Sequence, residues 1–485
     1  MSQTMQLDFL DQQGLDRMYD ACIQLMSKKG FKVDYEKGLK VLAEKGAEVN
    51  FETQIVKFSP ELIEKALKTA PKEFTVRGAK PEHDFALPHP NGSFYTSTCV
   101  QTMQYRDPIS GDVIPVTEKN LAEWCQLAQV LPNIHKVAIQ TPTEVVQEAA
   151  DLHGFNVLLQ NTSKPLMILA YCPESVELMF ELLLAWAGSE EVLRNRPQAI
   201  FYPTSLTPFG FKEMDIETMM NCCKYGVPQA VNSLAIAGAT SPTTVPGTAV
   251  LAAAEIITMI VMCQLFQPGS ECIASMYSTS MDMATGNALL GNAESMLARA
   301  LSGQFMKKCF NLPIETFSFM TDSYVEDGQA VLEKSLMPAM LDLSGTDIQY
   351  GMGRLGSTTL ASPLQMVIDD DLVPIIQKST EQIEINDDTL ALKEMMETPV
   401  LGDYVTLDHT YKHCRDNVRT KLFSPISLDP WIEQGEKDLR DRARDKYLAL
   451  KKDFKPLELP ASTIQDMNEV VKKADKVLFD IFQNK

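Results

Sequence analysis

From residue 166 the chain reads LMILAY (166–171) and from residue 199 it reads AIFYPT (199–204), with a helix-like segment between the two. Short runs of aliphatic, β-branched and aromatic residues are typical of buried strands. Eight such strands, each followed by a helix, predict an α/β fold of the (β/α)8 TIM-barrel type, whereas a doubly wound sheet would need fewer strands or two domains. The six other runs are SFYTS (93–97), KVAIQT (136–141), PQAVNSLAIAG (228–238), ECIASMYS (271–278), IETFSFMT (314–321) and DIQYGMG (347–353).

The segments before and after the eight strand–helix units have a different sequence pattern. Residues 8–29 and 35–45 carry apolar residues at three- and four-residue spacing, and Ser59-Pro60-Glu61 begins a third helix with a capping Ser and a Pro at its first position. The tail is charged and helical. We therefore expect three units: a mostly helical N-terminal unit (1–90), the barrel (91–385) and a C-terminal helical extension (386–485).

Charge and composition exclude several classes of function. The chain has 485 residues, with 44 Lys+Arg against 64 Asp+Glu and a net charge of −20. This balance argues against attraction to nucleic acid or an anionic membrane. The apolar stretch 248–266 contains Glu255 and Gln264, so we expect a buried helix there rather than a membrane span. Ten cysteines without a C-x-x-C pair and no signal-like start predict free thiols in the cytoplasm.

The active site of such a barrel lies at the carboxyl ends of its strands. Aromatic residues dominate these predicted ends, and aromatic faces attract a quaternary ammonium ion. Aromatic residues on strands are also common core residues, so packing is the alternative reading. The predicted strand ends carry Tyr95, Thr141, Tyr171, Tyr202, Tyr277, Phe319, Asp322, Tyr350 and Arg354.

Two other motifs are not part of this predicted aromatic site. GMGRLG (351–356) matches G-x-G-x-x-G, but it follows the eighth strand instead of opening the first βαβ unit, so NAD binding is not expected. The glycines of this motif permit close approach by a phosphate or a bulky cofactor, or simply form a tight turn.

His409 and His413 share a helical face but lack the Glu of H-E-x-x-H and a nearby third ligand, so we expect no metal. Glu144 and Asp322 are a possible carboxylate pair.

Several blocks resemble one known family. KYGVP (224–228) runs into LAIAGATSP (234–242), which resembles the central block of the trimethylamine methyltransferase (MttB) family. The family's opening and ending are matched in the same order along nearly the whole chain. The opening matches GFKV (30–33), KGAEV (45–49) and APKEF (70–74), and the ending matches TYKH (410–413), FSP (423–425), Trp431 and Arg442-Ala443.

The resemblance implies a (β/α)8 barrel that moves a methyl group from an amine to the Co(I) of a separate corrinoid protein, in methylamine metabolism such as methanogenesis or acetogenesis. Founding members use pyrrolysine. This chain has only standard residues and so resembles the non-pyrrolysine branch, whose substrates are quaternary amines such as glycine betaine, carnitine, proline betaine or γ-butyrobetaine.

No tightly bound cofactor is implied, because the acceptor is the partner's cobalamin. The corrinoid protein would dock at the barrel mouth, where Gly351, Gly353 and Gly356 would admit the ring. We also expect a homo-oligomer.

The chemistry suits a site poor in acids and bases, because a quaternary amine leaves as a neutral tertiary amine without a general acid. A betaine carboxylate would need a partner such as Gln349, Tyr350, Arg354 or His413. Two alternatives remain: a sensor that binds a quaternary amine without turnover, and a metal-assisted barrel lyase or hydrolase. The expected substrate-binding residues are Tyr95, Tyr202, Tyr277, Phe319, Gln349, Tyr350, Arg354 and His413.

Overall fold

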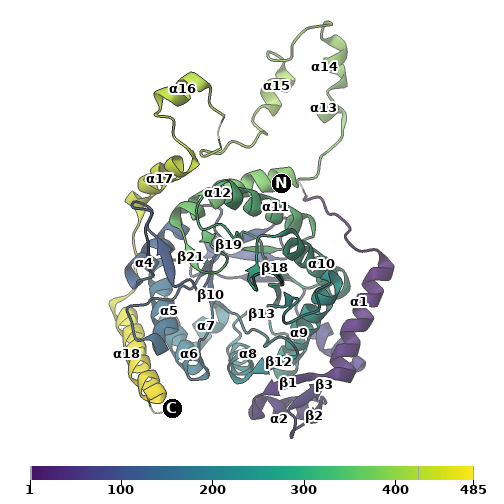
Figure 1. Ribbon diagram of the computed structural model, residues 1–485, viewed down its shortest axis with the longest axis vertical. Helices are drawn as coiled ribbons and strands as arrows, with labels where there is room; N and C mark the ends of the chain where they lie inside the picture. Colours follow the sequence, from purple (N-terminus) through teal and green to yellow (C-terminus); the bar gives the residue numbers. More distant parts are fainter. Residues whose placement is uncertain (1–2, 424, 484–485) are drawn as a thin grey trace.

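The computed structural model describes residues 3–423 and 425–483, and its centre is an eight-stranded parallel sheet (Figure 1). Each of the eight predicted runs contributes one strand, which confirms the TIM-barrel prediction. The strands are β6 (Tyr95–Thr98), β9 (Val137–Ala138), β10 (Leu166–Ile168), β11 (Ala199–Phe201), β13 (Gln229–Ser233), β15 (Cys272–Met276), β18 (Ile314–Phe317) and β19 (Ile348–Met352).

The sheet closes on itself between its first and last strands. β19 pairs in parallel with β6, with Ile348 opposite Tyr95. On the other side of β6, Ser97 forms a parallel bridge with Lys136, just before β9, and the Thr98 N–H donates to the Lys136 carbonyl at 3.1 Å. Because all strands run in one direction, their carboxyl ends meet at one rim, which we call the mouth.

Helices surround the barrel, as Figure 1 shows. One of them, α9 (Val245–Phe266), is the one helix within the described residues that is long and apolar enough to cross a membrane, yet 83% of its most apolar window is buried inside the protein. It is therefore a core helix, as its Glu255 and Gln264 predicted. The other surrounding helices are α4 (Glu118–Val130), α5 (Ala150–Asn161), α6 (Pro173–Ala187), α7 (Glu190–Asn195), α8 (Glu213–Tyr225), α10 (Ala293–Phe310), α11 (Gly328–Leu343) and α12 (Pro363–Ser379).

The N-terminal segment combines helices with a small sheet. Helix α1 (Gln12–Gln24) packs on α9, as does α3 (Pro60–Thr69), which begins at the expected cap, where the Ser59 side chain accepts from the Leu62 N–H. The sheet has the order β12-β1-β3-β2, and its edge strand β12 (Gly210–Lys212) comes from the barrel segment. The remaining elements here are β1 (Phe31–Asp34), α2 (Glu36–Glu44), β2 (Glu48–Asn50), β3 (Ile55–Lys57), β4 (Phe74–Val76) and β5 (Phe85–Leu87).

Two small sheets are built from loops that follow barrel strands, so they form part of the rim of the mouth. One has the order β20-β21-β7-β8 and the other the order β14-β16-β17. Their strands are β7 (Gln104–Arg106), β8 (Val113–Pro115), β14 (Ile236–Ala237), β16 (Thr279–Met281), β17 (Ala288–Leu289), β20 (Arg354–Leu355) and β21 (Leu360–Ala361).

After α12 the chain leaves the barrel and later returns to it. Residues 386–416, which we call the arm, contain α13 (Asp387–Leu390), α14 (Leu392–Glu397) and α15 (Asp408–His413), and none of these residues is buried. Figure 1 shows the arm projecting from the top of the molecule. The chain continues through α16 (Leu428–Glu433) and α17 (Leu439–Leu450) to α18 (Ala461–Gln483), which packs on α6. Ser424, within the expected family motif 423–425, lies outside the described residues.

Candidate functional site

Three aromatic rings stack at the carboxyl end of the barrel. Tyr277 follows β15, Phe317 ends β18 and Tyr350 lies in β19, and these three strands are neighbours in the sheet. The ring centroids are 3.8 Å apart for Tyr277 and Phe317, 4.9 Å for Phe317 and Tyr350, and 5.5 Å for Tyr277 and Tyr350. Each ring is buried, so the stack presents aromatic faces in a region of low dielectric.

A buried ion pair beside this stack contacts two tyrosines, of which Tyr277 belongs to the stack. The Lys136 ammonium lies 2.7 Å from the Glu315 carboxylate, and both side chains are fully buried. The Tyr202 hydroxyl donates to the same carboxylate at 2.5 Å, and the Tyr277 hydroxyl lies 3.4 Å from it. Burial, and then the negative charge of Glu315, hold the pKa of Tyr202 and of Tyr277 well above the ordinary value. Both hydroxyls therefore remain protonated donors.

Two buried guanidinium groups flank the aromatic stack. The Arg354 guanidinium lies 5.6 Å from the Tyr350 ring centre and donates to the Tyr350 hydroxyl at 2.7 Å. Arg299, from α10, lies 5.5 Å from the Phe317 ring centre, and burial lowers its pKa to about 9. Arg354 Nε and Arg299 Nη2 are buried without a hydrogen-bond partner among the described residues. Such spare N–H groups are suited to an anion, because a buried donor left unpaired is costly.

Two hollows open at the mouth, and Gln101 lines both. A pocket of about 210 Å³ is also lined by Tyr202, Lys212 and Asp215, and a groove of about 710 Å³ lies between the first rim sheet and Thr143. Gln101 has a φ of +53°, a left-handed conformation that non-glycine residues rarely adopt. Strained residues of this kind gather at functional sites, which supports the mouth as the candidate site.

The structure places three expected site residues away from the mouth. Tyr95 begins β6, so its ring lies at the amino end of the barrel, 4.6 Å from the His89 ring. Gln349 neighbours Tyr350 on β19 and points to the opposite face, where its amide donates to the Pro338 carbonyl of α11 at 2.9 Å. Phe319 is fully buried. Its ring packs against Phe94, with ring centres 6.5 Å apart. These positions correct the expectation that all three side chains face the mouth.

The C-terminal histidine and the glycine motif also require correction. His413 lies in α15 of the arm, where its ring pairs with Asp416 and Asp388, so it does not line the barrel. Gly351, Gly353 and Gly356 are buried by the protein itself. A Cβ on Gly353 would collide with a ring carbon of Trp124 in α4, so this glycine is required for helix–strand packing. A bulky ring has no room to approach it.

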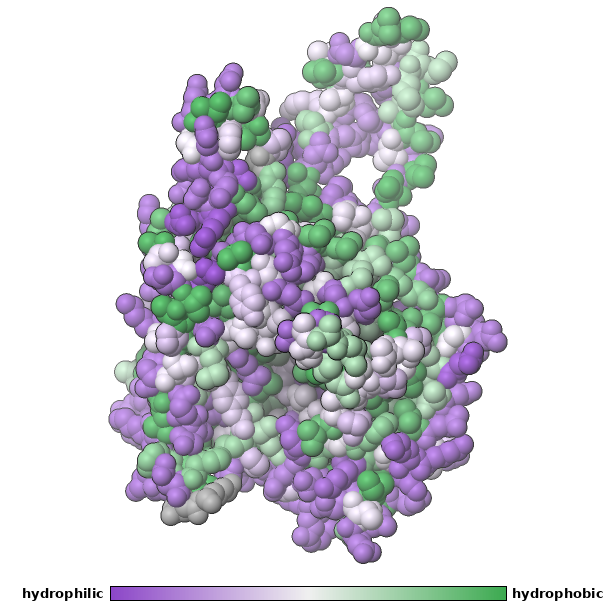
Figure 2. Space-filling view, viewed as in Figure 1, coloured by the Kyte–Doolittle hydropathy of each residue, from purple (hydrophilic) through white to green (hydrophobic). Residues whose placement is uncertain are grey.

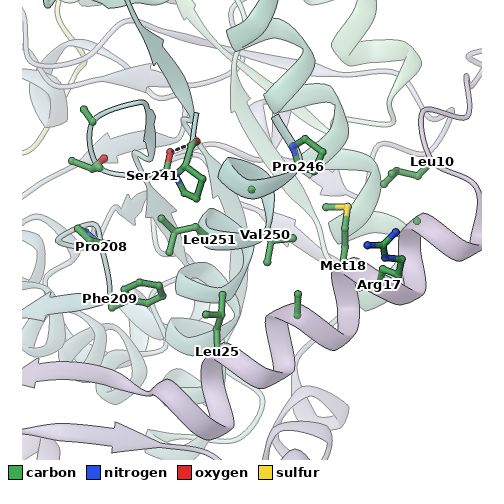
Figure 3. Close-up of a pocket in the computed structure, with 16 residues that line it drawn as sticks. Leu10, Arg17, Met18, Leu25, Pro208, Phe209, Ser241, Pro246, Val250 and Leu251 are labelled. Atoms are coloured by element: carbon green, nitrogen blue, oxygen red, sulfur yellow. Dashed lines mark hydrogen bonds between the residues drawn. The ribbon is translucent and has the colours of Figure 1, made fainter. Parts of the chain in front are cut away.

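A further apolar groove lies outside the barrel (Figure 3). It measures about 850 Å³ and runs between α1 and the start of α9, with Met18 and Val250 on its walls. The loop 239–242, part of the block that resembles the family, lines its rim. The groove contains none of the expected substrate-binding residues.

Comparison with known proteins supports the expected family. The family model described as trimethylamine methyltransferase (MTTB) matches residues 1–478. The trimethylamine methyltransferase MttB of Desulfitobacterium hafniense is 26% identical over 461 residues, which cover 94% of this chain and 92% of that protein. The MttB of Methanosarcina barkeri is 27% identical over 95% of this chain and 94% of its own length.

Two further matches concern substrate type and fold. A protein named glycine betaine methyltransferase, also from Desulfitobacterium hafniense, is 23% identical and covers 93% of this chain and 90% of that protein. The crystal structure of the Methanosarcina barkeri monomethylamine methyltransferase (MtmB) superposes with a TM-score of 0.51 at 11% identity, covering 99% of this chain and 95% of that one. The second match bears on the fold alone.

Proposed function

The chain belongs to the trimethylamine methyltransferase (MttB) family, and we propose that it transfers a methyl group from a betaine-type quaternary amine to the Co(I) corrinoid of a partner protein. One observation carries the choice of a quaternary amine: the aromatic cluster at the carboxyl end of a closed barrel, in which Tyr202 lines the 210 Å³ pocket and is linked through Glu315 to the stack of Tyr277, Phe317 and Tyr350. The glycine betaine methyltransferase among the relatives supports the same choice.

The aromatic side chains give the site an affinity for a cation that cannot donate hydrogen bonds. An aromatic face contributes about 0.5–2 kcal/mol to holding such a cation. Tyr202 reaches the 210 Å³ pocket at the mouth, and its hydroxyl is fixed by Glu315. A trimethylammonium group in this pocket would keep one methyl directed toward the opening, in line with the nitrogen that leaves. No proton is needed at that step, because the product amine leaves neutral.

The carboxylate of a betaine requires a separate partner. Arg354 suits this role, because its Nε is a buried donor without a partner among the described residues and its Nη2 is held by Tyr350. A chain of contacts connects the mouth pocket with Arg354. Tyr202 and Tyr277 both contact Glu315, Tyr277 stacks with Tyr350, and the Tyr350 hydroxyl accepts from Arg354. This arrangement supports a substrate with a cationic end and an anionic end, as in glycine betaine.

The corrinoid protein is proposed to dock on the rim of the mouth. A methyl group passes directly from nitrogen to cobalt, so the corrinoid must reach the same opening. Several large apolar side chains are exposed on the rim loops, and an apolar surface of this kind is typical of a protein interface. They include Met103, Val113, Met283 and Tyr324. The cobalamin is then a substrate carried by the partner, in the cytoplasm.

Self-association is the other proposed interaction. The arm exposes large apolar residues that none of the described residues covers, and Figure 2 shows green side chains along this projection. These residues include Met396, Val400, Leu401 and Val405. A second copy of the chain would cover them in a homo-oligomer.

Calorimetric titration with two ligands separates the cation from the carboxylate. Tyr202→Leu is expected to weaken both tetramethylammonium and glycine betaine, by up to about thirtyfold. Arg354→Gln is expected to weaken glycine betaine by at least about tenfold and to leave tetramethylammonium unchanged.

The matched control is Tyr95→Leu, which removes an aromatic ring at the amino end of the barrel and should leave both affinities unchanged. Equal losses in Tyr95→Leu and Tyr202→Leu would contradict the proposed site. Binding without any demethylated product in the presence of reduced corrinoid protein would favour a sensor, and a requirement for added divalent metal would favour a lyase or hydrolase.

A further inference from the structure

The arm brings together three side chains of a type that binds metal ions. His409 and His413 lie four residues apart on α15, and their ring centres are 4.5 Å apart. Asp388, 21 residues before His409, reaches them from α13. One ring nitrogen of each histidine and one carboxylate oxygen of Asp388 lie within 4.8 Å of one another. Folding therefore supplies the third ligand that the sequence pattern of the two histidines lacked.

Hydrogen bonds outside this cluster set the protons on both rings. His413 Nδ1 lies 2.8 Å from an Asp416 carboxylate oxygen, which only accepts, so Nδ1 carries a proton. His409 Nε2 lies 2.9 Å from the Asp388 backbone carbonyl and likewise donates. Each ring can then offer its other nitrogen to a metal ion, and on His413 that nitrogen gives up any proton it shares with Asp388 when the ion binds. Histidines that bind metals are oriented in this way by a carboxylate or a carbonyl on the far side of the ring.

The nitrogen left free on His413 faces the carboxylate of Asp388. Its Nε2 is buried and has no hydrogen-bond partner among the described residues, although it lies 3.2 Å from Asp388 Oδ2. Two ligand atoms that each lie about 2.0–2.1 Å from a tetrahedral zinc ion are about 3.3 Å apart. The observed separation therefore matches a nitrogen and an oxygen that share one metal ion.

We propose that Asp388, His409 and His413 bind one Zn²⁺ ion, with water in the fourth position. Two imidazole nitrogens favour zinc over magnesium or calcium, which take oxygen ligands. The Lys412 ammonium, which pairs with Asp388, would be displaced by the ion. That movement is open to it because the Lys412 side chain is 61% exposed.

The role of the ion follows from what the arm lacks. Its three helices have four, six and six residues, and none of these residues is buried. Helices of this length are unstable without packing, and small segments without a core are commonly held by a metal. A zinc ion between α13 and α15 closes the loop that joins them, and so orders the arm.

Metal content measures the proposal directly. The full-length protein is treated with a chelator, dialysed against Zn²⁺ and then against metal-free buffer. About one zinc per chain is expected for the wild type, and none for His409→Ala/His413→Ala. The matched control is His153→Gln, which removes a ring that lies 2.9 Å from Glu118 and 2.9 Å from Asp475 on its two sides. This variant should retain the zinc.

Limited proteolysis provides a second measurement on the same proteins. Zn²⁺ should slow cleavage within residues 386–416 of the wild type and of His153→Gln at least tenfold, and should not slow cleavage of the double variant. The double variant is expected to keep the thermal midpoint of the barrel, because the arm buries no residue. Zinc retained by the double variant would overturn the proposal, as would a wild type without zinc. Cleavage of the wild-type arm at the same rate with and without Zn²⁺ would overturn the ordering role.

Discussion

The barrel and the arm handle charged side chains in opposite ways. In the barrel, Lys136 pairs with Glu315 and Lys334 with Asp369, and all four side chains are fully buried. In the arm, Lys412 pairs with Asp388 while both remain largely exposed to water. A buried pair is held firmly because either charge alone would be very costly there, whereas an exposed pair contributes little. The barrel can therefore hold polar side chains in place through its own packing. The arm has no such packing and depends on an added ligand, such as the proposed zinc ion.

The buried pair at the site provides the strongest test of this contrast. Lys136→Met leaves the Glu315 carboxylate buried without its cation, which should lower the free energy of unfolding by about 3–5 kcal/mol. Urea denaturation measures the loss. Adding Glu315→Gln should restore part of it, because the unpaired charge is removed. Lys412→Met in the arm is the control and should leave barrel unfolding unchanged. An equal change in both lysine variants would break the comparison.

Two Gly→Ala variants separate the cost of a steric clash from the cost of backbone strain. Gly353 (φ +80°) and Gly435 (φ +87°) both have left-handed backbones, but only a Cβ at Gly353 would meet Trp124. Gly353→Ala should therefore cost about 2–3 kcal/mol of unfolding free energy. Gly435→Ala, in the exposed segment after α16, meets nothing within 4 Å and should leave barrel unfolding nearly unchanged. Similar losses at both positions would show that strain alone matters.

Asp342, at the end of α11, predicts a dependence on pH that the arm should not share. Burial raises the pKa of Asp342 to about 7, although the Thr380 hydroxyl opposes the shift by donating to its carboxylate. The folded state thus keeps a proton that the unfolded chain releases near pH 4. The stability from this group is complete below pH 4 and is lost as pH rises toward 7.

Asp342→Asn should remove that loss, about 3 kcal/mol across this range. The measurement is the difference in unfolding free energy between variant and wild type from pH 4 to pH 7. Val400→Ala in the arm, which changes no titratable group, is the matched control, and its difference should stay constant. A constant difference for Asp342→Asn would mean that the carboxyl group is already ionised in the folded protein.

The smallest expected effect is that of cutting the arm. Because none of residues 386–416 is buried, brief proteolysis of the metal-free protein should cleave there first. The nicked protein should keep the thermal midpoint of the intact one to within about 1 °C, since no core contact is lost. Scanning calorimetry of the two forms measures this. A clear drop in the midpoint would show that the arm supports the barrel.

The alternation of strand-like and helix-like runs was sufficient to predict the barrel, because each buried strand is a short apolar run. The site was predictable only in part. Tyr202, Tyr277, Tyr350 and Arg354 do come together in the barrel, although Tyr350 lies within β19 and not at its end. Tyr95 lies at the wrong end because β6 begins at that residue, whereas the sequence pattern had the strand end there.

The remaining differences arise from the geometry of strands and from pairing over long distances. Gln349 and Tyr350 are adjacent on β19, and adjacent side chains point to opposite faces, so both could not line the barrel. Lys136 and Glu315 were missed because they are 179 residues apart and nothing local marks them as partners. The sequence did not predict Asp388 as a third ligand beside His409 and His413 for the same reason, because it lies 21 residues before His409.

The central claim, methyl transfer from a quaternary amine, is tested most directly by the absorbance of the corrinoid. The purified chain is mixed with a corrinoid protein reduced to Co(I), and formation of methyl-Co(III) is followed with glycine betaine or with trimethylamine as the methyl donor. We expect methylation from a betaine-type quaternary amine, little or none from trimethylamine, and at least a tenfold slower rate at low glycine betaine concentration in Arg354→Gln. Rapid methylation from trimethylamine, with no reaction from any betaine, would contradict the account.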